Sequence, residues 1–349
     1  MTSILHRAAC WFLHSGIQDS SGGVARYYRA DSAVNAPVSN EITGYGVTAF
    51  AYLCSLDPKS EYRAAAIRAA RYLVNEAWDP HAHTVPFEPG SPLAYFFDLG
   101  IIARGLLSAW RLTLEDAFRD RAREAALSMA FDFLGEGAFH PVISLPEKQP
   151  LAYEARWSRS PGCYQLKAAL AWHEIGDAHA SRMFESALAF AFANHEEFLR
   201  PETNPDRVMD RLHAYCYFLE AVLFATDRAE ARDAAAYGIK RVAGLLREIR
   251  PRFERSDVCA QLLRARLIAH HQGALPLDET AAGEEAEWTA GYQAESSDPR
   301  LHGGFWFGTR GGELVPFMNP ASTAFCMQAL TLWRQHRTNA WNFELHQLI

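Results

Sequence analysis

Two kinds of helical segment alternate along the chain. Segments of the first kind are apolar on nearly all sides, as in residues 41–56, 92–113 and 207–226. Segments of the second kind carry polar residues along one face, as in residues 60–77 and 228–248. A helix that is apolar all round has to be covered on every side, whereas an amphipathic helix covers a core with one face. The alternation therefore predicts an inner set of helices that an outer set encloses.

This alternation continues from end to end and predicts twelve helices in six pairs. Each pair joins one amphipathic helix to one that is more uniformly apolar, so six inner helices can form a ring inside six outer ones. The expected fold class is all-α: an (α/α)6 toroid of six helical hairpins, in a single domain that spans residues 1–349. An irregular all-α domain or an open solenoid would show a similar pattern. We expect the helices over residues 3–17, 41–56, 60–77, 92–113, 115–134, 161–175, 178–194, 207–226, 228–248, 256–271, 281–294 and 320–335.

The loops that enter the inner helices are long, whereas several return loops are very short, such as Gly176-Asp177. Long loops in compact domains tend to carry function, and here they would gather on one face around the mouth of the central cavity. The first and the last of these long loops contain paired glycines, in "GGVARYYRAD" (residues 22–31) and "GGFWFGTRGGELVPF" (residues 303–317). We expect each to form a short β-hairpin, and closure of the ring would bring the two side by side. The long loops cover residues 18–40, 78–91, 137–160, 195–206 and 295–319.

The composition is that of a soluble globular protein, and it narrows the choice of partners. Of the 349 residues, 49% are hydrophobic and 21% are charged, and the net charge is −7. No basic stripe is present, which argues against a nucleic-acid partner. No stretch approaches the roughly 18 apolar residues of a membrane span. The N-terminus lacks the charged start and the cleavage site of a signal peptide.

Cysteine and histidine positions give no sign of a metal site. The six cysteines are scattered and none forms a Cys-x-x-Cys pair, which predicts reduced core residues in a cytoplasmic protein. His81 and His83 form a His-x-His pair, but no third ligand follows at a convincing spacing. The glycine-rich motifs of dinucleotide and phosphate binding are missing. The sequence therefore predicts neither a metal site nor a cofactor, and it leaves association into a homodimer open.

Four stretches of the chain, residues 20–53, 94–113, 160–177 and 303–330, resemble the six-hairpin (α/α)6 toroid carbohydrate-active enzymes. The segment "FDLG", which contains Asp98, is similar to the Asp-Leu-Gly segment of unsaturated glucuronyl hydrolases, whose aspartate is essential there. The resemblance implies a toroid fold and a carbohydrate substrate. Hydrolases, epimerases and lyases share this scaffold, so the reaction stays open.

Three polar residues inside apolar helical runs are candidates for chemistry. Asp98 lies in "YFFDLGII", where a carboxylate costs several kcal/mol unless it is paired or faces a wet cavity. Asp210 and His213 are three residues apart in "RVMDRLHAYCYF" and share a helix face, so together they could move a proton at neutral pH. The structural alternatives are a turn-capping role for Asp98 and a local ion pair of Asp210 with Arg207 or Arg211.

A dense polar and aromatic cluster occupies residues 153–159, "YEARWSR". Aromatic faces stack on sugar rings, and arginines bind carboxylates through two parallel hydrogen bonds. A substrate-binding loop and an ordinary loop anchored by salt bridges both fit this composition. The candidate residues in the cluster are Tyr153, Glu154, Arg156, Trp157 and Arg159.

The first and the last long loop add further candidates for binding. Glu41 and Tyr45 begin the first inner helix, where a glutamate can also serve only to interact with the helix dipole. Trp306, Arg310 and Glu313 alternate along the expected second hairpin, which would place them on one face toward the cavity or in hairpin packing.

The favoured function is a glycoside hydrolase that acts on an oligo- or polysaccharide with paired carboxylates. Asp98 and Asp210 are the expected pair, with Glu154 and Glu41 in reserve, and Arg156, Arg159 or Arg310 would bind a uronic acid. One alternative is an epimerase, isomerase or lyase that uses His213 or Tyr45 as a base. Another is a toroid without catalysis that binds a glycan or a partner protein.

Overall fold

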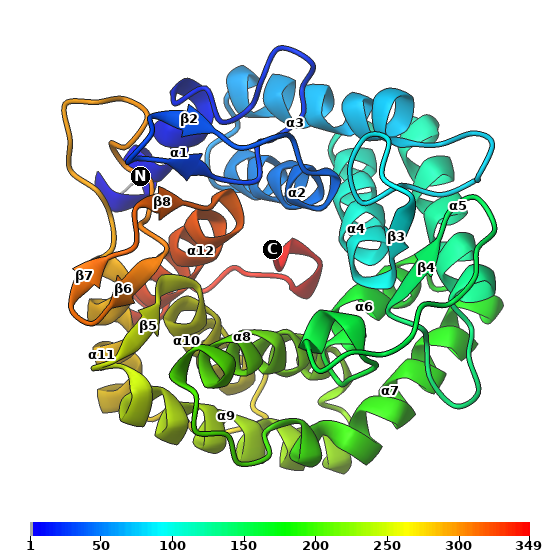
Figure 1. Cartoon of the computed structure of the whole chain (residues 1–349). Helices are drawn as coiled ribbons and strands as arrows, with labels where there is room; N and C mark the ends of the chain where they lie inside the picture. The colour runs from blue at the N-terminus through cyan, green and yellow to red at the C-terminus, as the bar shows by residue number, and fades with distance from the viewer. Residues whose placement is uncertain (1–2) are drawn as a thin grey trace. The chain divides into compact units, whose positions relative to one another are not determined.

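The computed structural model describes residues 3–349, and this part of the chain contains twelve α-helices (Figure 1). The prediction of twelve helices is confirmed. None of these helices has both the length and the apolar composition needed to cross a lipid bilayer. The helices are α1 (Ser3–His14), α2 (Asn40–Leu56), α3 (Ser60–Tyr72), α4 (Phe96–Thr113), α5 (Asp116–Asp132), α6 (Gln165–Ile175), α7 (Ala178–Phe198), α8 (Pro205–Val222), α9 (Ala229–Ile249), α10 (Ser256–His271), α11 (Glu279–Ala290) and α12 (Pro320–Arg337).

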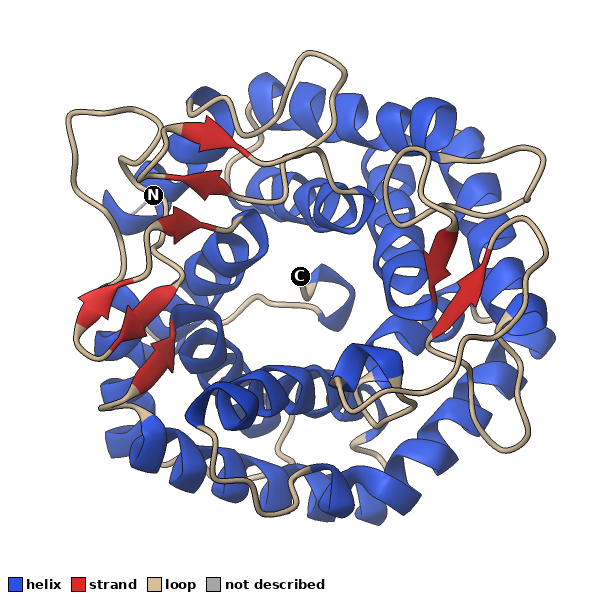
Figure 2. Cartoon of the chain, viewed as in Figure 1, coloured by secondary structure: helices blue, strands red, loops and turns tan. Residues whose placement is uncertain are grey.

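Short β-strands lie in the segments that connect the helices (Figure 2). The expected hairpin in the last loop is present, because β6 and β7 pair with Arg310 opposite Glu313 around Gly311 and Gly312, which both have positive φ. The first and the last glycine-rich segments also lie side by side, as expected, since β1 pairs with β8. The strands are β1 (Tyr28–Arg29), β2 (Val34–Asn35), β3 (Leu93–Tyr95), β4 (Val142–Ser144), β5 (Phe253–Arg255), β6 (Gly308–Arg310), β7 (Glu313–Leu314) and β8 (Phe317–Met318).

The described chain folds into two compact units, each made of separate stretches of sequence. Unit 1 contains residues 3–15, 27–34 and 191–345, and unit 2 contains the remaining residues from 16 to 349. In unit 2, α2, α4 and α6 pack side by side, with α3 and α5 against them. In unit 1, α8, α10 and α12 pack side by side, and α9, α11 and α1 cover them (Figure 1). The first helix of the chain, α1, therefore packs against the last, α12, and the two form one helical pair.

The burial of the helices follows the alternation in the sequence. In α4, every residue from Phe96 to Ala109 is buried, whereas α9 buries only one face. Glycines allow the inner helices of unit 2 to approach closely. A Cβ atom on Gly105 would lie 2.6 Å from the carbonyl oxygen of Gly44, and one on Gly100 would lie 2.4 Å from the Cβ of Ala168. The glycine of "FDLG" is thus a packing residue between α4 and α6.

Two inner helices begin in the same way, directly after a strand. The last residue of β3, Tyr95, precedes α4 with φ −116° and ψ 132°, and the last residue of β5, Arg255, precedes α10 with φ −114° and ψ 132°. The expected start of α4 at residue 92 is wrong, because residues 93–95 form the strand β3, which pairs with β4, and the helix begins at Phe96. This strand-to-helix junction places Asp98 and Asp257 in the first turns of α4 and α10.

Candidate active site

Two carboxyl groups from neighbouring inner helices form the centre of the candidate site in unit 2. Glu41 lies in the first turn of α2 and is partly buried, and Asp98 lies in the first turn of α4 with 7% of its surface exposed. Burial raises the pKa of Glu41 to about 7. Burial and the charge of Glu41 together raise the pKa of Asp98 well above its usual value, and the nearby Arg26 only partly offsets this.

The hydrogen bonding of Asp98 differs from that expected of an aspartate whose role is only to cap a turn. Its Oδ2 atom is buried and has no hydrogen-bond partner within residues 3–349. Buried polar atoms are nearly always paired, so an atom of this kind is well suited to meet a ligand. A buried carboxyl group beside a second carboxyl group tends to keep its proton at neutral pH. Burial favours the protonated form of both groups, and the charge of Glu41 favours it further at Asp98.

Aromatic and cationic side chains surround this pair. Arg26 forms an ion pair with Glu88 at 3.2 Å and lies over the ring of Phe87 at 4.7 Å. Phe87 in turn packs on Tyr95, with ring centroids 4.9 Å apart, and the Arg159 guanidinium lies 5.3 Å from the Tyr95 ring on β3. Burial raises the pKa of Tyr95. The charge of Arg159 partly offsets this, and the charge of Asp98 adds to it. The wall beside Asp98 is therefore aromatic and positively charged.

The structure brings the cluster at residues 153–159 to the same wall. Trp157 packs edge-on against Tyr164, with ring centroids 4.9 Å apart. Arg156 and Glu154 lie near Tyr95, since the charge of Arg156 lowers the pKa of Tyr95 and that of Glu154 raises it. Tyr153 is hydrogen-bonded to His140 at 2.9 Å. Glu154 is exposed, in contrast to the buried Asp98.

The remaining candidate of unit 2, Tyr45, lies inside the core of α2 with 2% of its surface exposed. This burial leaves Tyr45 less accessible than Glu41, which is on the same helix. The role of Tyr45 as a base or in substrate binding stays a prediction.

A second polar cluster forms around His213 in unit 1. The Nδ1 atom of His213 lies 2.9 Å from the Oε1 atom of Gln261 and 3.7 Å from the Oδ2 atom of Asp257. Burial and the charge of Arg255 lower the pKa of His213 to about 4, so its imidazole is neutral at physiological pH. Asp210, which shares the helix with His213, is half exposed and forms an ion pair with Arg255 at 3.1 Å.

Sequence reasoning missed the two residues of α10 that hold His213. Asp257 accepts two hydrogen bonds from Arg255, at 3.0 and 2.7 Å, and one from the hydroxyl group of Ser322 at 3.0 Å. Burial acts to raise the pKa of Asp257, but the charges of Arg255 and His213, together with the hydrogen bonds from Arg255 and Ser322, outweigh burial and lower it. The signal was present in "RFERSDV", where an aspartate follows an aromatic residue and a short strand-like stretch, as it does in "LAYFFD".

The candidates of the last loop are tied to neighbouring groups of unit 1. Arg310 forms an ion pair with Asp206 at 3.2 Å and lies over the ring of Phe253 at 4.7 Å. Trp306 is partly buried, and its backbone carbonyl accepts a hydrogen bond from Ser256 at 2.8 Å. Neither residue makes a described contact with His213 or Asp210.

The expected pairing of Asp98 with Asp210 stays a prediction, because these residues belong to different units. Within unit 2, the carboxyl group that acts on Asp98 is Glu41, which the sequence analysis held in reserve. Within residues 3–349, no group of three or more histidine, cysteine, aspartate or glutamate side chains is arranged to hold a metal ion.

Solved structures of several sugar-processing proteins are similar to this chain over nearly its whole length. A cellobiose 2-epimerase from Spirochaeta thermophila is 11% identical, with a TM-score of 0.74 over 96% of this chain and 95% of that one. A D-mannose isomerase is 11% identical, with a TM-score of 0.66 over 94% of this chain and 97% of the other. An alpha-1,6-mannanase from Salegentibacter, in an inactive variant with two aspartates replaced by asparagine, is 11% identical, with a TM-score of 0.64 over 95% and 99%.

These similarities show the fold. The structures belong to the (α/α)6 toroid class, and the chain shares it, so the expected fold class and the resemblance to this class of enzymes are confirmed. No protein-family model and no curated relative matches the sequence.

Proposed function

We propose that this protein is a carbohydrate-active enzyme, and specifically a glycoside hydrolase whose reacting groups are Asp98 and Glu41. The observation that carries the proposal is the buried carboxyl pair, in which the Oδ2 atom of Asp98 has no hydrogen-bond partner within residues 3–349. The fold supports a sugar substrate, because the similar structures include a mannanase, an epimerase and an isomerase.

The two raised pKa values suit the two roles of a glycosidase. Asp98 would donate its proton to the glycosidic oxygen as the bond between this oxygen and the anomeric carbon breaks. Glu41, ionised, would take a proton from the water molecule whose oxygen attacks the anomeric carbon, or would attack this carbon itself. Arg26, near both groups, would favour the charged form of Glu41.

The wall beside the pair would bind the sugar. Tyr95 and Trp157 offer ring faces on which a pyranose can stack through its C–H bonds. Arg156 and Arg159 would bind a carboxylate on the substrate, which favours a uronic acid over a neutral sugar. The inactive mannanase variant has two adjacent aspartates replaced, and this sequence contains no two adjacent aspartates; the pair proposed here comes instead from α2 and α4.

A sugar epimerase or isomerase is the second candidate, and the neutral imidazole of His213 favours it. A neutral imidazole can accept a proton from a carbon next to a carbonyl group. Gln261 fixes the ring of His213 at 2.9 Å, which would keep it oriented for this task. Its low pKa makes it a weak base, and this places the second candidate behind the first.

A substrate screen with variants would separate these functions. The protein is incubated with polysaccharides, uronic-acid oligosaccharides and free disaccharides in deuterated water, and products are analysed for new reducing ends and for deuterium on carbon. The hydrolase proposal predicts new reducing ends, no carbon-bound deuterium, and loss of turnover in Asp98→Asn and Glu41→Gln. Deuterium on carbon that depends on His213 would establish the isomerase instead, and saturable glycan binding without turnover would establish a binding protein.

A further inference from the structure

Three ionisable side chains form a hydrogen-bonded row that joins the ends of three helices of unit 1, and none of them belongs to the candidate active site. The Nε2 atom of His271, the last residue of α10, lies 3.1 Å from the Nδ1 atom of His336, near the end of α12. The Nε2 atom of His336 lies 2.8 Å from the Oε1 atom of Glu279, the first residue of α11. The row therefore connects α10, α12 and α11.

One end of the row holds the segment that follows α12, residues 338–344. The ring of Trp341 stacks flat on that of His271, with centroids 3.7 Å apart and planes 7° from parallel. Asn342, beside it, is exposed and accepts a hydrogen bond from the side chain of Gln335 at 2.6 Å. Because exposed hydrogen bonds compete with water, the stack on His271 is the firmer attachment of this segment to the helices.

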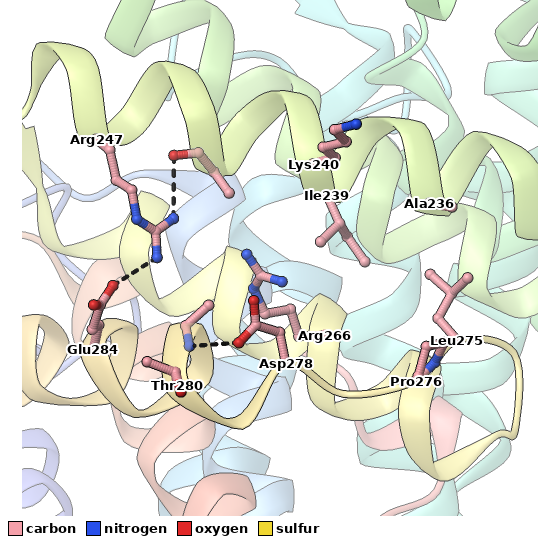
Figure 3. Close-up of a pocket in the computed structure, with 12 residues that line it drawn as sticks. Ala236, Ile239, Lys240, Arg247, Arg266, Leu275, Pro276, Asp278, Thr280 and Glu284 are labelled. Carbon is pink, nitrogen blue, oxygen red and sulfur yellow. Dashed lines mark hydrogen bonds and ion pairs between the residues drawn. The ribbon is translucent and has the colours of Figure 1, made fainter.

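The other end of the row holds the start of α11. Glu279 pairs with His336, and Asp278 caps the same helix by accepting a hydrogen bond from the backbone nitrogen of Ala281 at 3.0 Å (Figure 3). Asp278 and Thr280 also line a pocket of about 610 Å³ between α9 and α11 (Figure 3). Release of Glu279 would therefore loosen one wall of this pocket.

The hydrogen bonds of the row limit how many protons it can hold. A carboxylate only accepts, so the Nε2 atom of His336 donates to Glu279, and its Nδ1 atom accepts from His271. One added proton is compatible with the row, because one ring can be a cation while the other still supplies the acceptor between them. A second added proton makes both rings cations, and two N–H groups then face each other across 3.1 Å. Attraction between the rings is then replaced by repulsion.

The surroundings of the two rings oppose this second proton. Burial and the charges of His336 and His270 lower the pKa of His271. The ring centroid of His270 lies 5.2 Å from that of His271 and 5.6 Å from that of His336. Glu279 is the acidic group that counters these charges, and it is half exposed. The other ionisable groups on the surrounding elements are Arg337 on α12, which lies over the Trp333 ring that packs on His336, and the exposed Glu344 in residues 338–344.

We propose that this row is an acid-sensitive latch, which stays closed with one added proton and opens with the second. The closed latch holds residues 338–344 and the start of α11, and opening moves the His271 ring and the stacked Trp341 away from α12. Because the pKa of His271 is lowered, the folded protein binds this proton less tightly than an unfolded chain does. The latch is therefore fully closed above about pH 6.5, the value for an unfolded chain, and opens as the pH falls through the lower value of the folded protein.

Hydrogen–deuterium exchange of the full chain, read by mass spectrometry between pH 7.5 and 4.5, tests the latch without any need for a substrate. Exchange rates are divided by the intrinsic rate at each pH. In the wild type, peptides over residues 338–344 and 279–283 should lose protection at least about 10-fold on acidification, whereas the buried helix α8 should keep its protection. Constant protection at residues 338–344, or a loss that extends equally to α8, would overturn the latch.

Variants at neighbouring histidines assign the response to the row. The amide nitrogen of His271→Gln can donate to His336 as the Nε2 atom does but takes up no proton, so both segments should stay protected at every pH. His270→Gln is the matched control, since His270 forms no side-chain hydrogen bond within residues 3–349, and it should keep the acid transition. Loss of protection at any pH in His271→Gln, or its absence in His270→Gln, would overturn the assignment.

Trp341→Ala tests the attachment of the segment separately. It should expose residues 338–344 already at pH 7.5, while the start of α11 stays protected until the pH falls. Protection of residues 338–344 at pH 7.5 in this variant would show that the stack on His271 does not hold them, and it would overturn this part of the latch.

Discussion

Asp98 and Asp257 occupy matching places in the two units but have opposite environments. Each lies in the first turn of an inner helix that follows directly on a short strand. Asp257 accepts two hydrogen bonds from Arg255 and one from Ser322, and its pKa is lowered. Asp98 has an oxygen without a partner within residues 3–349 and a raised pKa.

The difference shows how one backbone position can hold a fully paired carboxylate in one unit and, in the other, a carboxyl oxygen without a partner within residues 3–349. The same strand-to-helix junction brings a carboxylate to the start of each helix. What decides its role is the residue that ends the strand, because Arg255 ends β5 whereas Tyr95 ends β3. A buried carboxyl group without its own cation keeps a proton, and a proton held at neutral pH is available for catalysis.

The largest expected effect is the loss of turnover in Asp98→Asn. Loss of a general acid lowers kcat by about 10²–10⁴-fold, and the isosteric amide removes no packing volume. Steady-state kinetics on the substrate found in the screen would measure this, with thermal unfolding as a check that the fold is kept. If the variant retained more than about a tenth of the wild-type rate, Asp98 would not be the acid.

Asp257→Asn should act mainly on stability. Removal of the Asp257 charge leaves the buried charge of Arg255 uncompensated except by the half-exposed Asp210, and costs up to about 3 kcal/mol. Urea unfolding would measure the change, and a double variant that also carries Arg255→Gln should recover part of the loss, because the uncompensated charge is then removed. A loss below about 0.5 kcal/mol would show that this pair does not hold the start of α10.

Glu41 should make the protein less stable as the pH rises. Because the pKa of Glu41 is about 7 in the folded protein and about 4.5 in an unfolded chain, the folded state binds the proton more tightly. Its contribution is complete below pH 4.5 and is lost as the pH rises through 7, by about 3 kcal/mol. Urea unfolding from pH 4.5 to 8 should show this decline in the wild type and a weaker one in Glu41→Gln. Glu61→Gln, at an exposed position in the first turn of α3, serves as the control, and equal slopes in all three proteins would contradict the pKa assignment.

A smaller effect is expected when the packing that positions Asp98 is changed. Gly100→Ala forces α4 and α6 apart and should cost about 1–3 kcal/mol, because its Cβ would lie 2.4 Å from that of Ala168. Gly244→Ala, on the open surface of α9, meets no atom within 4 Å and should stabilise the protein by about 0.5–1 kcal/mol. Thermal unfolding compares the two, and equal changes would show that the approach of the helices does not constrain this position.

The fold was largely predictable because its signal is local and repeated. Apolar and amphipathic segments alternate in the sequence, and each helix was found within a few residues of its expected bounds. The strand at 93–95 was missed, since its pairing partner lies at 142–144 and no local pattern shows that contact. Asp98 was found because an isolated carboxylate in an apolar run is conspicuous. Partners such as Gln261 depend on contacts between helices that are far apart in the chain, and they could not be foreseen.

The central claim is that Asp98 holds a proton at neutral pH, and infrared spectroscopy tests it most directly. Protein labelled with ¹³C in the aspartate side chains is measured at pH 7 as the wild type and as Asp98→Asn. The account predicts a carboxylic-acid carbonyl band in the wild type that is missing from the variant. A wild-type spectrum with only carboxylate bands, or an acid band that survives in Asp98→Asn, would contradict it.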